Sequence, residues 1–344
     1  MDRLTWIHAD HQLAELRVLP YIKSADMEID ISPGAELIDN TWSMTLPADI
    51  WAQQPIETGH YVYAPGTEWG GPVTLIRHAT ADGSVTIQGP TWRGLLQQRR
   101  IYPPAGAGYL EVNAEANTAI AAVVGSAFGS LFQVSTADTG VAVSAQYRYQ
   151  TMANGLQNTL RGVGLRLNVV FDNTVPAVIL SAQPISDLAD TVEISQDYNV
   201  NFTSAIGNVE LANHCLALGS GELAEREVVN IYAVDGIYYL NRPPELPESE
   251  VRTVLLDYPN AETREELINS AVQRLQEKGP AQSIDIDELL IDVDAQLGDQ
   301  LPVRDRLTGL VANSEIINKI LSISAEGTIS ITAKVGILSI QAAQ

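Results

Sequence analysis

The amino-acid sequence predicts a mainly β protein with an α+β domain inserted within the chain. Alternation of apolar and polar residues, the period of a half-buried strand, recurs before residue 90 and again after residue 190. Turn residues such as Pro33-Gly34 and Asp82-Gly83 divide these stretches into short strands. Residues 112–183 hold 3 acidic and 3 basic residues, whereas 1–111 hold 13 and 7 and 184–344 hold 26 and 10. This neutral island indicates the insertion.

The β domain predicted for residues 1–108 is organised around the segment Val73–Tyr102. Alternation there predicts two strands joined by the Asp82-Gly83 turn. The residues from Trp92 to Arg100 predict a short helical turn with its Trp and Leu side chains on one side. Three shorter strands are expected earlier, at 25–31, 41–46 and 59–64. Short strands separated by turns favour an antiparallel sandwich or barrel.

Residues 109–186 are predicted to form the inserted α+β domain. Asn113 is expected to cap a helix that begins at Ala114 and ends at Gly125, with apolar residues on one face. A second helix is expected over 151–161, because Met152, Leu156 and Leu160 recur at helical spacing. A strand pair at 165–171 and 178–180 completes the expected domain.

Residues 187–250 are predicted to complete the first β domain, and 251–344 to form a helix and a second β domain. Thr263 and Glu266 match a capping box for a helix over 260–278. Apolar positions change from even to odd between Ile284 and Val293, which predicts a bulge or turn near 288–290. The other expected strands are 192–194, 208–218, 228–234, 237–240, 316–323 and 328–335, with turns at Asp235-Gly236, Gly279-Pro280 and Gly298-Asp299.

The overall composition excludes several classes of protein. With 20 Lys and Arg against 42 Asp and Glu, the net charge is −22, whereas proteins that read nucleic-acid sequence are normally basic. The single cysteine, Cys215, allows no disulfide within the chain. No stretch approaches the ~18 apolar residues of a membrane span, and the N-terminus lacks a secretory signal. We therefore expect no sequence-specific nucleic-acid binding, no membrane span, and synthesis in a host bacterial cytoplasm.

An acidic run is the sharpest candidate for chemistry. Carboxylates bind Ca²⁺, or act in pairs as the acid and base of a glycosidase. The spacing is not that of a helix–loop–helix calcium loop, and alternation favours the solvated face of a strand. No catalytic, cofactor-binding or metal-ligating residue is therefore assigned. The run comprises Asp285, Asp287, Glu288, Asp292, Asp294 and Asp299.

Other polar motifs favour structural roles. His8 and His11 would share one face of a helix, but no third ligand accompanies them in the sequence. His214 and Cys215 are adjacent on a predicted strand and point to opposite faces, so Cys215 is interpreted as a buried structural residue. Gly219-Ser220-Gly221 lacks the Gly-Lys-Ser/Thr of a phosphate loop.

Two groups of residues are candidates for binding. The Arg99-Arg100 pair fits either an acidic partner or the carbonyl groups at the end of its own helix. Of the five Trp residues, most are expected in the core, and one or two could anchor an interface.

Residues 89–101, with the sequence Gly-Pro-Thr-Trp-Arg-Gly-Leu-Leu-Gln-Gln-Arg-Arg-Ile, resemble a recurrent segment of phage tail hub proteins. In that family a strand ends in Gly, and a short helix ends in Leu-Leu and Arg. The resemblance covers about 40–330 and implies two small, tube-like β-barrel domains with the α+β domain inserted in the first. Further matches in the family's order are Thr41–Leu46, Glu68–Val73, Ala217–Glu222, Arg226, Gln273–Gly279, Leu297–Asp299 and Val335-Gly336.

The resemblance implies a structural virion protein, a baseplate or tail-tip hub, without a cofactor. In the family three copies form a ring that continues the tail tube. The implied partners are further copies of the chain, the distal tail ring protein, the tape-measure protein, and tip or fibre proteins. Such a hub closes or extends the channel used in DNA ejection. Because the chain ends at Gln344, no peptidase, lysozyme-like or receptor-binding extension is expected.

Two other classes stay open. A β-rich carbohydrate hydrolase or depolymerase would place two carboxylates in a cleft with aromatic residues, and a monomeric carbohydrate-binding module would expose a flat aromatic platform.

For the hub, we hypothesise that acids of 184–344 line the bore and repel DNA phosphates over ~8–10 Å. The alternative is that they keep the protein soluble.

Overall fold

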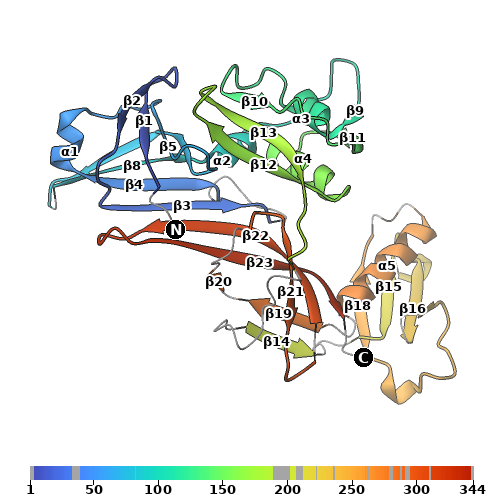
Figure 1. Ribbon diagram of the computed structural model, residues 1–344. Coiled ribbons are helices and arrows are strands. Elements are labelled where there is room, and N and C mark those ends of the chain that lie inside the picture. The colour runs from blue at the N-terminus through green and yellow to red at the C-terminus, as the bar shows by residue number, and fades with distance from the viewer. Residues whose placement is uncertain are drawn as a thin grey trace. The chain divides into compact units, whose positions relative to one another are not determined.

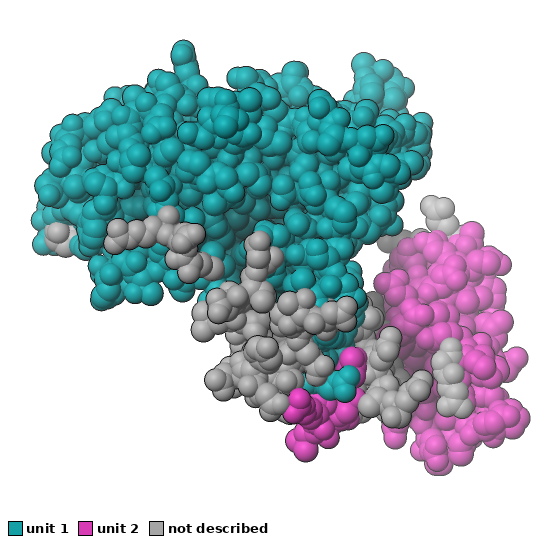
Figure 2. Space-filling model, viewed as in Figure 1, with its two compact units in different colours: residues 1–201, 286–304, 312–339 teal, residues 202–285, 305–311, 340–344 magenta. Residues whose placement is uncertain are grey.

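The computed structural model describes residues 4–32, 39–81, 83–188, 202–206, 212–221, 223–234, 237–259, 261, 263–278, 282–286, 289–290, 295–309 and 311–341. The chain forms two compact units (Figure 2). Unit 1 comprises 1–201, 286–304 and 312–339, and unit 2 comprises 202–285, 305–311 and 340–344. Strands predominate over helices in the described residues, which confirms the mainly β prediction (Figure 1).

The largest sheet of unit 1 combines strands from both ends of the chain. Its order is β20-β23-β22-β3-β4-β8-β7, and β21 also pairs with β22. Met27 and Ile29 of β3, like Trp42 and Met44 of β4, alternate into the core as predicted. The strands are β3 (Ser24–Asp30), β4 (Thr41–Pro47), β7 (Leu75–Ala79), β8 (Ser84–Pro90), β20 (Leu289–Leu290), β21 (Gln300–Arg304), β22 (Val311–Ile323) and β23 (Ile329–Gln341).

A second, four-stranded sheet touches the first at two glycines. Its order is β2-β1-β5-β6, with β2 (Glu15–Val18), β1 (Ile7–Ala9), β5 (Tyr61–Tyr63) and β6 (Gly70–Pro72). A Cβ atom on Gly71 of β6 would lie 2.0 Å from the carbonyl oxygen of Pro90, and one on Gly89 of β8 would lie 1.8 Å from that of Pro72. The two backbones therefore meet directly. Trp42 Nε1 donates a hydrogen bond to the Pro90 oxygen at 3.1 Å beside this contact.

The segment Val73–Tyr102 folds as predicted into a hairpin followed by a short helix. Strands β7 and β8 pair antiparallel, and Gly83 in the connecting turn has a positive φ of 59°. Asp82 lies outside the described residues. Helix α2 (Trp92–Gln97) begins at Thr91, whose side-chain oxygen accepts a hydrogen bond from the Gly94 amide at 3.2 Å. The preceding helix is α1 (Ala48–Gln53).

The α+β segment contains the predicted helices and strand pair, and three further strands. Its elements are β9 (Leu110–Glu115), α3 (Ala116–Val124), β10 (Phe132–Val134), β11 (Ala142–Tyr147), α4 (Met152–Arg161), β12 (Leu165–Asp172) and β13 (Ala177–Pro184). The sheet orders are β10-β13-β12 and β11-β9. The predicted helix start at Asn113-Ala114 is wrong, because both residues pair with β11. Glu115 is the N-cap instead, and its carboxylate accepts from the Thr118 amide at 3.0 Å.

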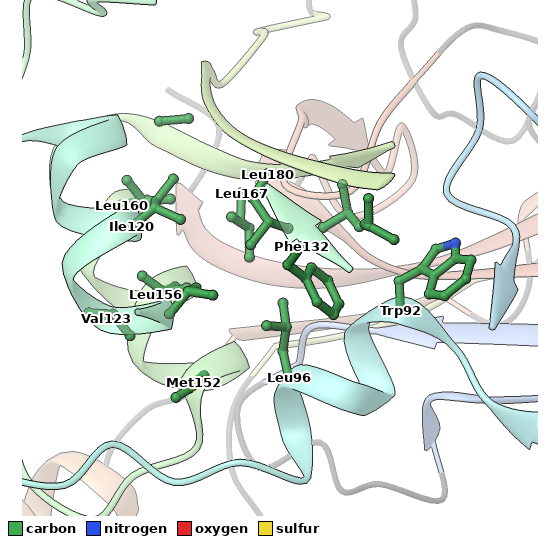
Figure 3. Packing of buried hydrophobic residues seen from close by; sticks show 14 of the residues in the cluster. Trp92, Leu96, Ile120, Val123, Phe132, Met152, Leu156, Leu160, Leu167 and Leu180 are labelled. Atoms are coloured by element: carbon green, nitrogen blue, oxygen red, sulfur yellow. The ribbon is translucent and has the colours of Figure 1, made fainter. Parts of the chain in front are cut away.

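The α+β segment shares one hydrophobic core with earlier parts of unit 1. Trp92 and Leu96 of α2 pack into the same cluster as Ile120 of α3 and Leu156 of α4 (Figure 3). The Phe171 ring stacks between those of Tyr63 and Trp92, at centroid distances of 3.8 and 5.7 Å. The four-domain division at 108, 186 and 250 and the closure of the sheets into barrels remain predictions.

Unit 2 is built around a four-stranded sheet and one long helix. The sheet order is β17-β16-β15-β18, where β15 and β18 are parallel. Leu267, Ala271 and Leu275 of α5 are buried in its core. Thr263 caps α5 as predicted by accepting from the Glu266 amide at 3.1 Å. The elements are β14 (Phe202–Ile206), β15 (His214–Leu218), η3 (Leu223–Glu225), β16 (Val228–Val234), β17 (Ile237–Tyr239), η4 (Glu248–Glu250), β18 (Thr253–Asp257), α5 (Arg264–Lys278) and β19 (Gln282–Ile286).

The change of parity after Ile284 coincides with a change of sheet. Strand β19 pairs with β14, whereas β20 pairs with β23, so 284–293 is not one continuous strand. The described residues do not include residues 287–288 between the two strands, the predicted strand 192–194, or the predicted turns at 235–236 and 279–280. Gly298 supplies a predicted turn with a φ of 92°. Within the described ranges, no helix has the length and apolar character needed to cross a bilayer.

The cap of α3 gives unit 1 a predicted pH dependence. Partial burial raises the pKa of Glu115, but hydrogen bonds from the Thr139 hydroxyl at 2.7 Å and from the Thr139 and Thr118 amides outweigh it and lower the pKa to about 2. The unfolded value is about 4.5. Because the folded pKa is depressed, the stabilisation is complete above about pH 4.5 and is lost as the pH falls towards 2.

We expect Glu115→Gln to lower the free energy of unfolding by about 1 kcal/mol at pH 5, the usual value of a cap. The difference from the wild type should shrink as the pH is lowered to 3. Urea unfolding followed by tryptophan fluorescence measures it, and Glu111→Gln on the exposed side of β9 is the control for loss of charge. A difference that stays constant with pH would contradict the assignment of the cap to the ionised carboxylate.

Candidate functional site

The structure describes one side chain of the acidic run, that of Asp299. Asp287, Glu288, Asp292 and Asp294 lie outside the described residues, and only the backbone of Asp285 is described, in β19. Asp299 is buried. Its carboxylate accepts from the Ser186 amide at 3.0 Å and the Gln296 amide at 2.8 Å, and lies 3.2 Å from Arg166 Nε. Asp299 therefore anchors two chain segments inside unit 1.

His8 and His11 do not lie on a helix, so their i, i+3 spacing does not place them on one helix face. His8 lies on β1 and His11 in the turn between β1 and β2. Strand pairing places His8 opposite Val62, so His60, two residues before Val62, is its diagonal neighbour on the same face. His8 Nε2 lies 2.9 Å from His60 Nδ1. Burial, and then the neighbouring His60 and Arg17, lower the pKa of His8 to about 4.

The topology instead forms a cluster that the sequence did not reveal. His11, Glu57 and His60 each place a potential ligand atom within 4.8 Å of the others. Two turns assemble this group, which we call the histidine cluster. The His60 amide donates to the Glu57 carbonyl at 3.1 Å, and the His11 and His60 rings meet edge to face at 4.7 Å. Glu57 and His60 were missed as partners of His11 because they lie more than forty residues away along the chain.

His214 and Cys215 face opposite sides of β15, as predicted. Cys215 is a free, buried thiol in the core of unit 2, and burial raises its pKa to about 11. His214 stacks on Tyr232 and its ring nitrogens contact Thr253 Oγ1 at 2.8 Å and Asn230 Oδ1 at 3.1 Å. Because a thiol with a raised pKa is a poor nucleophile, the pair has a structural role.

The Gly219-Ser220-Gly221 segment, which lacks the full phosphate-loop motif, lies in a turn. The Gly219 and Glu227 amides bond across it, to the Glu227 and Ser220 carbonyls, both at 2.8 Å. Gly221 takes a φ of 95°. Arg226 donates to the Gly219 carbonyl at 3.1 Å and forms an ion pair with Asp257. The Gly219 amide is therefore paired across the turn and is not directed at a phosphate.

Arg99 and Arg100 do not cap their own helix through the contacts described. The Arg99 guanidinium lies over the Phe128 ring, 5.6 Å from its centroid. Arg100 donates to the Tyr149 carbonyl at 3.1 Å. Trp6, Trp42, Trp69 and Trp92 are buried, which confirms that most Trp residues belong to the core.

Arg100 belongs to an exposed aromatic and basic surface of unit 1. The Arg148 guanidinium lies over the rings of Tyr109 and Tyr149, at 5.8 and 5.4 Å from their centroids, and the Tyr102 ring meets Tyr149 edge to face. Tyr102 is 68% exposed and Tyr149 53%. The antiparallel pairing of β9 with β11 brings Tyr109 beside Arg148. These residues, Arg100, Tyr102, Tyr109, Arg148 and Tyr149, form the Tyr–Arg patch.

The composition of the Tyr–Arg patch is that of an interface. Tyr and Arg are enriched where proteins bind one another, because they combine large contact area with hydrogen-bond donors. The patch carries two positive charges on a chain whose net charge is −22. An acidic surface is the complementary partner for it.

Comparison with known proteins finds no matching protein family and no matching curated sequence. Solved structures are similar over nearly the whole chain. The 43 kDa tail protein of prophage MuSo2 from Shewanella oneidensis has a TM-score of 0.51 and 13% identity over 96% of this chain and 98% of that one. The Listeria monocytogenes prophage tail protein gp18 has a TM-score of 0.49, with 14% identity over 97% and 95%.

A tail protein from Neisseria meningitidis has a TM-score of 0.48, with 11% identity over 96% of this chain and 95% of that one. The likeness to the Shewanella protein identifies the fold: this chain has the fold of a phage tail protein.

Proposed function

We propose that this chain is a structural hub of a phage-like tail, located at the distal end of the tail tube in the virion. Three copies form a ring that closes or extends the DNA channel, contacts the distal tail ring protein and the tape-measure protein above, and holds tip or fibre proteins below. The observation that carries this proposal is the likeness of the fold to a prophage tail protein over 96% of one chain and 98% of the other.

Two features of this chain support an assembly role. The Tyr–Arg patch presents an aromatic and basic surface to solvent. Residues 184–344, with 26 acidic and 10 basic side chains, supply the complementary charge. Within the proposed ring, acids of this segment face the bore and repel the phosphates of passing DNA, an effect that reaches ~8–10 Å at physiological salt.

The mass of the purified protein tests the ring. We expect light scattering after size exclusion to give three times the chain mass of 37.2 kDa, and negative-stain images to show a central hole. A monomer at all concentrations, also in the presence of the distal tail ring protein, would contradict the hub. Glycan hydrolysis would then be measured to test the carbohydrate-hydrolase alternative.

The Arg148→Ala variant, measured in the same way, tests whether the Tyr–Arg patch lies in the interface between copies of the chain. Removing an arginine anchor from a protein interface often costs more than 1 kcal/mol, so the concentration at which trimers dissociate should rise about tenfold. Arg77→Ala on the exposed strand β7 is the matched control and should leave this concentration unchanged. Equal effects of the two variants on this concentration would show that the Tyr–Arg patch is not part of the interface.

A further inference from the structure

We propose that the histidine cluster binds a divalent transition-metal ion of the zinc class, with His11, Glu57 and His60 as ligands. Two imidazoles and one carboxylate are a recurrent ligand set for zinc, and their potential ligand atoms already lie within 4.8 Å of one another. The proposal is independent of the tail role, because it depends only on the local geometry of unit 1.

His60 is oriented for this role by a buried neighbour. Its Nδ1 atom lies 2.9 Å from Nε2 of His8 and 3.3 Å from the Glu57 amide nitrogen, so this side of the ring is occupied. The Nε2 atom is the one left for a metal ion. Histidine ligands in proteins commonly donate their second ring N–H to a fixed acceptor, which sets the tautomer and the ring orientation. The fully buried His8 is the fixed neighbour of His60 Nδ1. With Nε2 on an ion, Nδ1 would carry the proton and donate to His8 Nε2, in place of the contact in which Nδ1 accepts from the Glu57 amide.

The other two ligands come from turns that the backbone holds in place. The turn that carries His11 is closed by Asp10, whose carboxylate accepts from the Gln12 and Ala14 amides at 2.8 and 2.9 Å. The His11 ring lies over Gly59, where a Cβ atom would come within 2.8 Å of His11 Nδ1. A glycine at this position therefore leaves room for the ring beside His60.

A bound ion would connect two loops at one end of the four-stranded sheet. His11 follows β1, and Glu57 and His60 precede β5, so coordination would join these loops across the β1–β5 pair. Three protein ligands leave one position of a tetrahedral ion for water. His11 and Glu57 are exposed and His60 is buried, so the ion would enter from the solvent side.

Metal titration of the untagged full chain tests the site, because an affinity tag of histidines would itself bind the probe. After treatment with a chelator, Co²⁺ should produce visible absorption bands of a tetrahedral site, and Zn²⁺ should displace it at one equivalent per chain. Zn²⁺ should also raise the melting temperature recorded by tryptophan fluorescence.

His11→Ala and Glu57→Gln each remove one ligand from an exposed turn. We expect each to weaken Zn²⁺ binding by at least ~10-fold, since changes that only disturb a ligand's support cost 10–100-fold. His78→Ala, which removes an exposed histidine from β7, is the matched control and should bind as the wild type does. Far-UV circular dichroism checks that the variants fold.

Two results would overturn the proposal. One is a wild-type chain that takes up no Co²⁺ or Zn²⁺ at one equivalent. The other is an affinity that is the same in His11→Ala, Glu57→Gln and His78→Ala, since the bound ion would then lie elsewhere.

Discussion

Gly89→Ala is expected to lower the free energy of unfolding of unit 1 by at least about 3 kcal/mol, the upper part of the usual cost of overpacking. A Cβ atom at this position would lie 1.8 Å from the carbonyl oxygen of Pro72, and backbone cannot rotate away as a side chain would. The two sheets of unit 1 would have to separate there. The hydrogen bond from Trp42 Nε1 to the Pro90 oxygen lies beside the same contact and would be strained with it.

Thermal unfolding followed by tryptophan fluorescence measures this effect. All five Trp residues belong to unit 1, so the signal reports on that unit alone. A loss of 3 kcal/mol corresponds to a decrease of roughly 6–12 °C in Tm for a unit of this size. Gly108→Ala is the matched control, because a Cβ atom there meets nothing within 4 Å. It should change stability by less than about 0.5 kcal/mol. Equal melting temperatures for the two variants would contradict the direct backbone contact.

Arg93→Met is expected to cost about 3 kcal/mol, the lower end of the range for breaking a buried ion pair from one side. Arg93 is buried in α2, forms an ion pair with Glu68, and donates to the Leu167 carbonyl of β12 at 2.7 Å. Removing the guanidinium leaves the Glu68 carboxylate and the Leu167 oxygen without this donor. Glu68 keeps 19% of its side chain in contact with water, which is why the lower end applies.

Urea unfolding of unit 1, again by tryptophan fluorescence, gives the cost of Arg93→Met. Arg77→Met removes an exposed arginine from β7 and should stay within about 0.5 kcal/mol of the wild type. The double variant with Glu68→Gln should recover part of the loss, because no unpaired charge is then left. An Arg93→Met cost below about 1 kcal/mol would show that the ion pair contributes little.

The elements with a clear period or a clear cap could be predicted from the sequence. The strands with Met27 and Trp42, the hairpin before Trp92 and the helices α4 and α5 all follow from local patterns. The start of α3 could not be predicted from propensity alone. Asn113 is a good capping residue, but its pairing with Ser144 of β11 extends the strand and moves the cap to Glu115.

Features that depend on distant parts of the chain were missed. The burial of Arg93 requires Glu68 and Leu167, which lie 25 and 74 residues away along the chain. The histidine cluster requires the pairing of β1 with β5, and no local pattern around His11 predicts that pairing. The contacts of Arg99 and Arg100 were also missed, because Phe128 and the Tyr149 carbonyl come from the α+β segment and not from their own helix.

The pairing of β3 with β22 has a consequence for synthesis in the cell. Asn318 Nδ2 donates to Glu28 Oε1 at 2.7 Å across 290 residues of chain. At ~5–20 residues per second, a ribosome needs roughly 15–60 s to deliver β22 after β3 has emerged. During that time the edge of β3, with Met27 and Ile29 beside it, has no strand to pair with. An unpaired strand edge is a template for pairing with another chain, so truncated chains that end before β22 should aggregate.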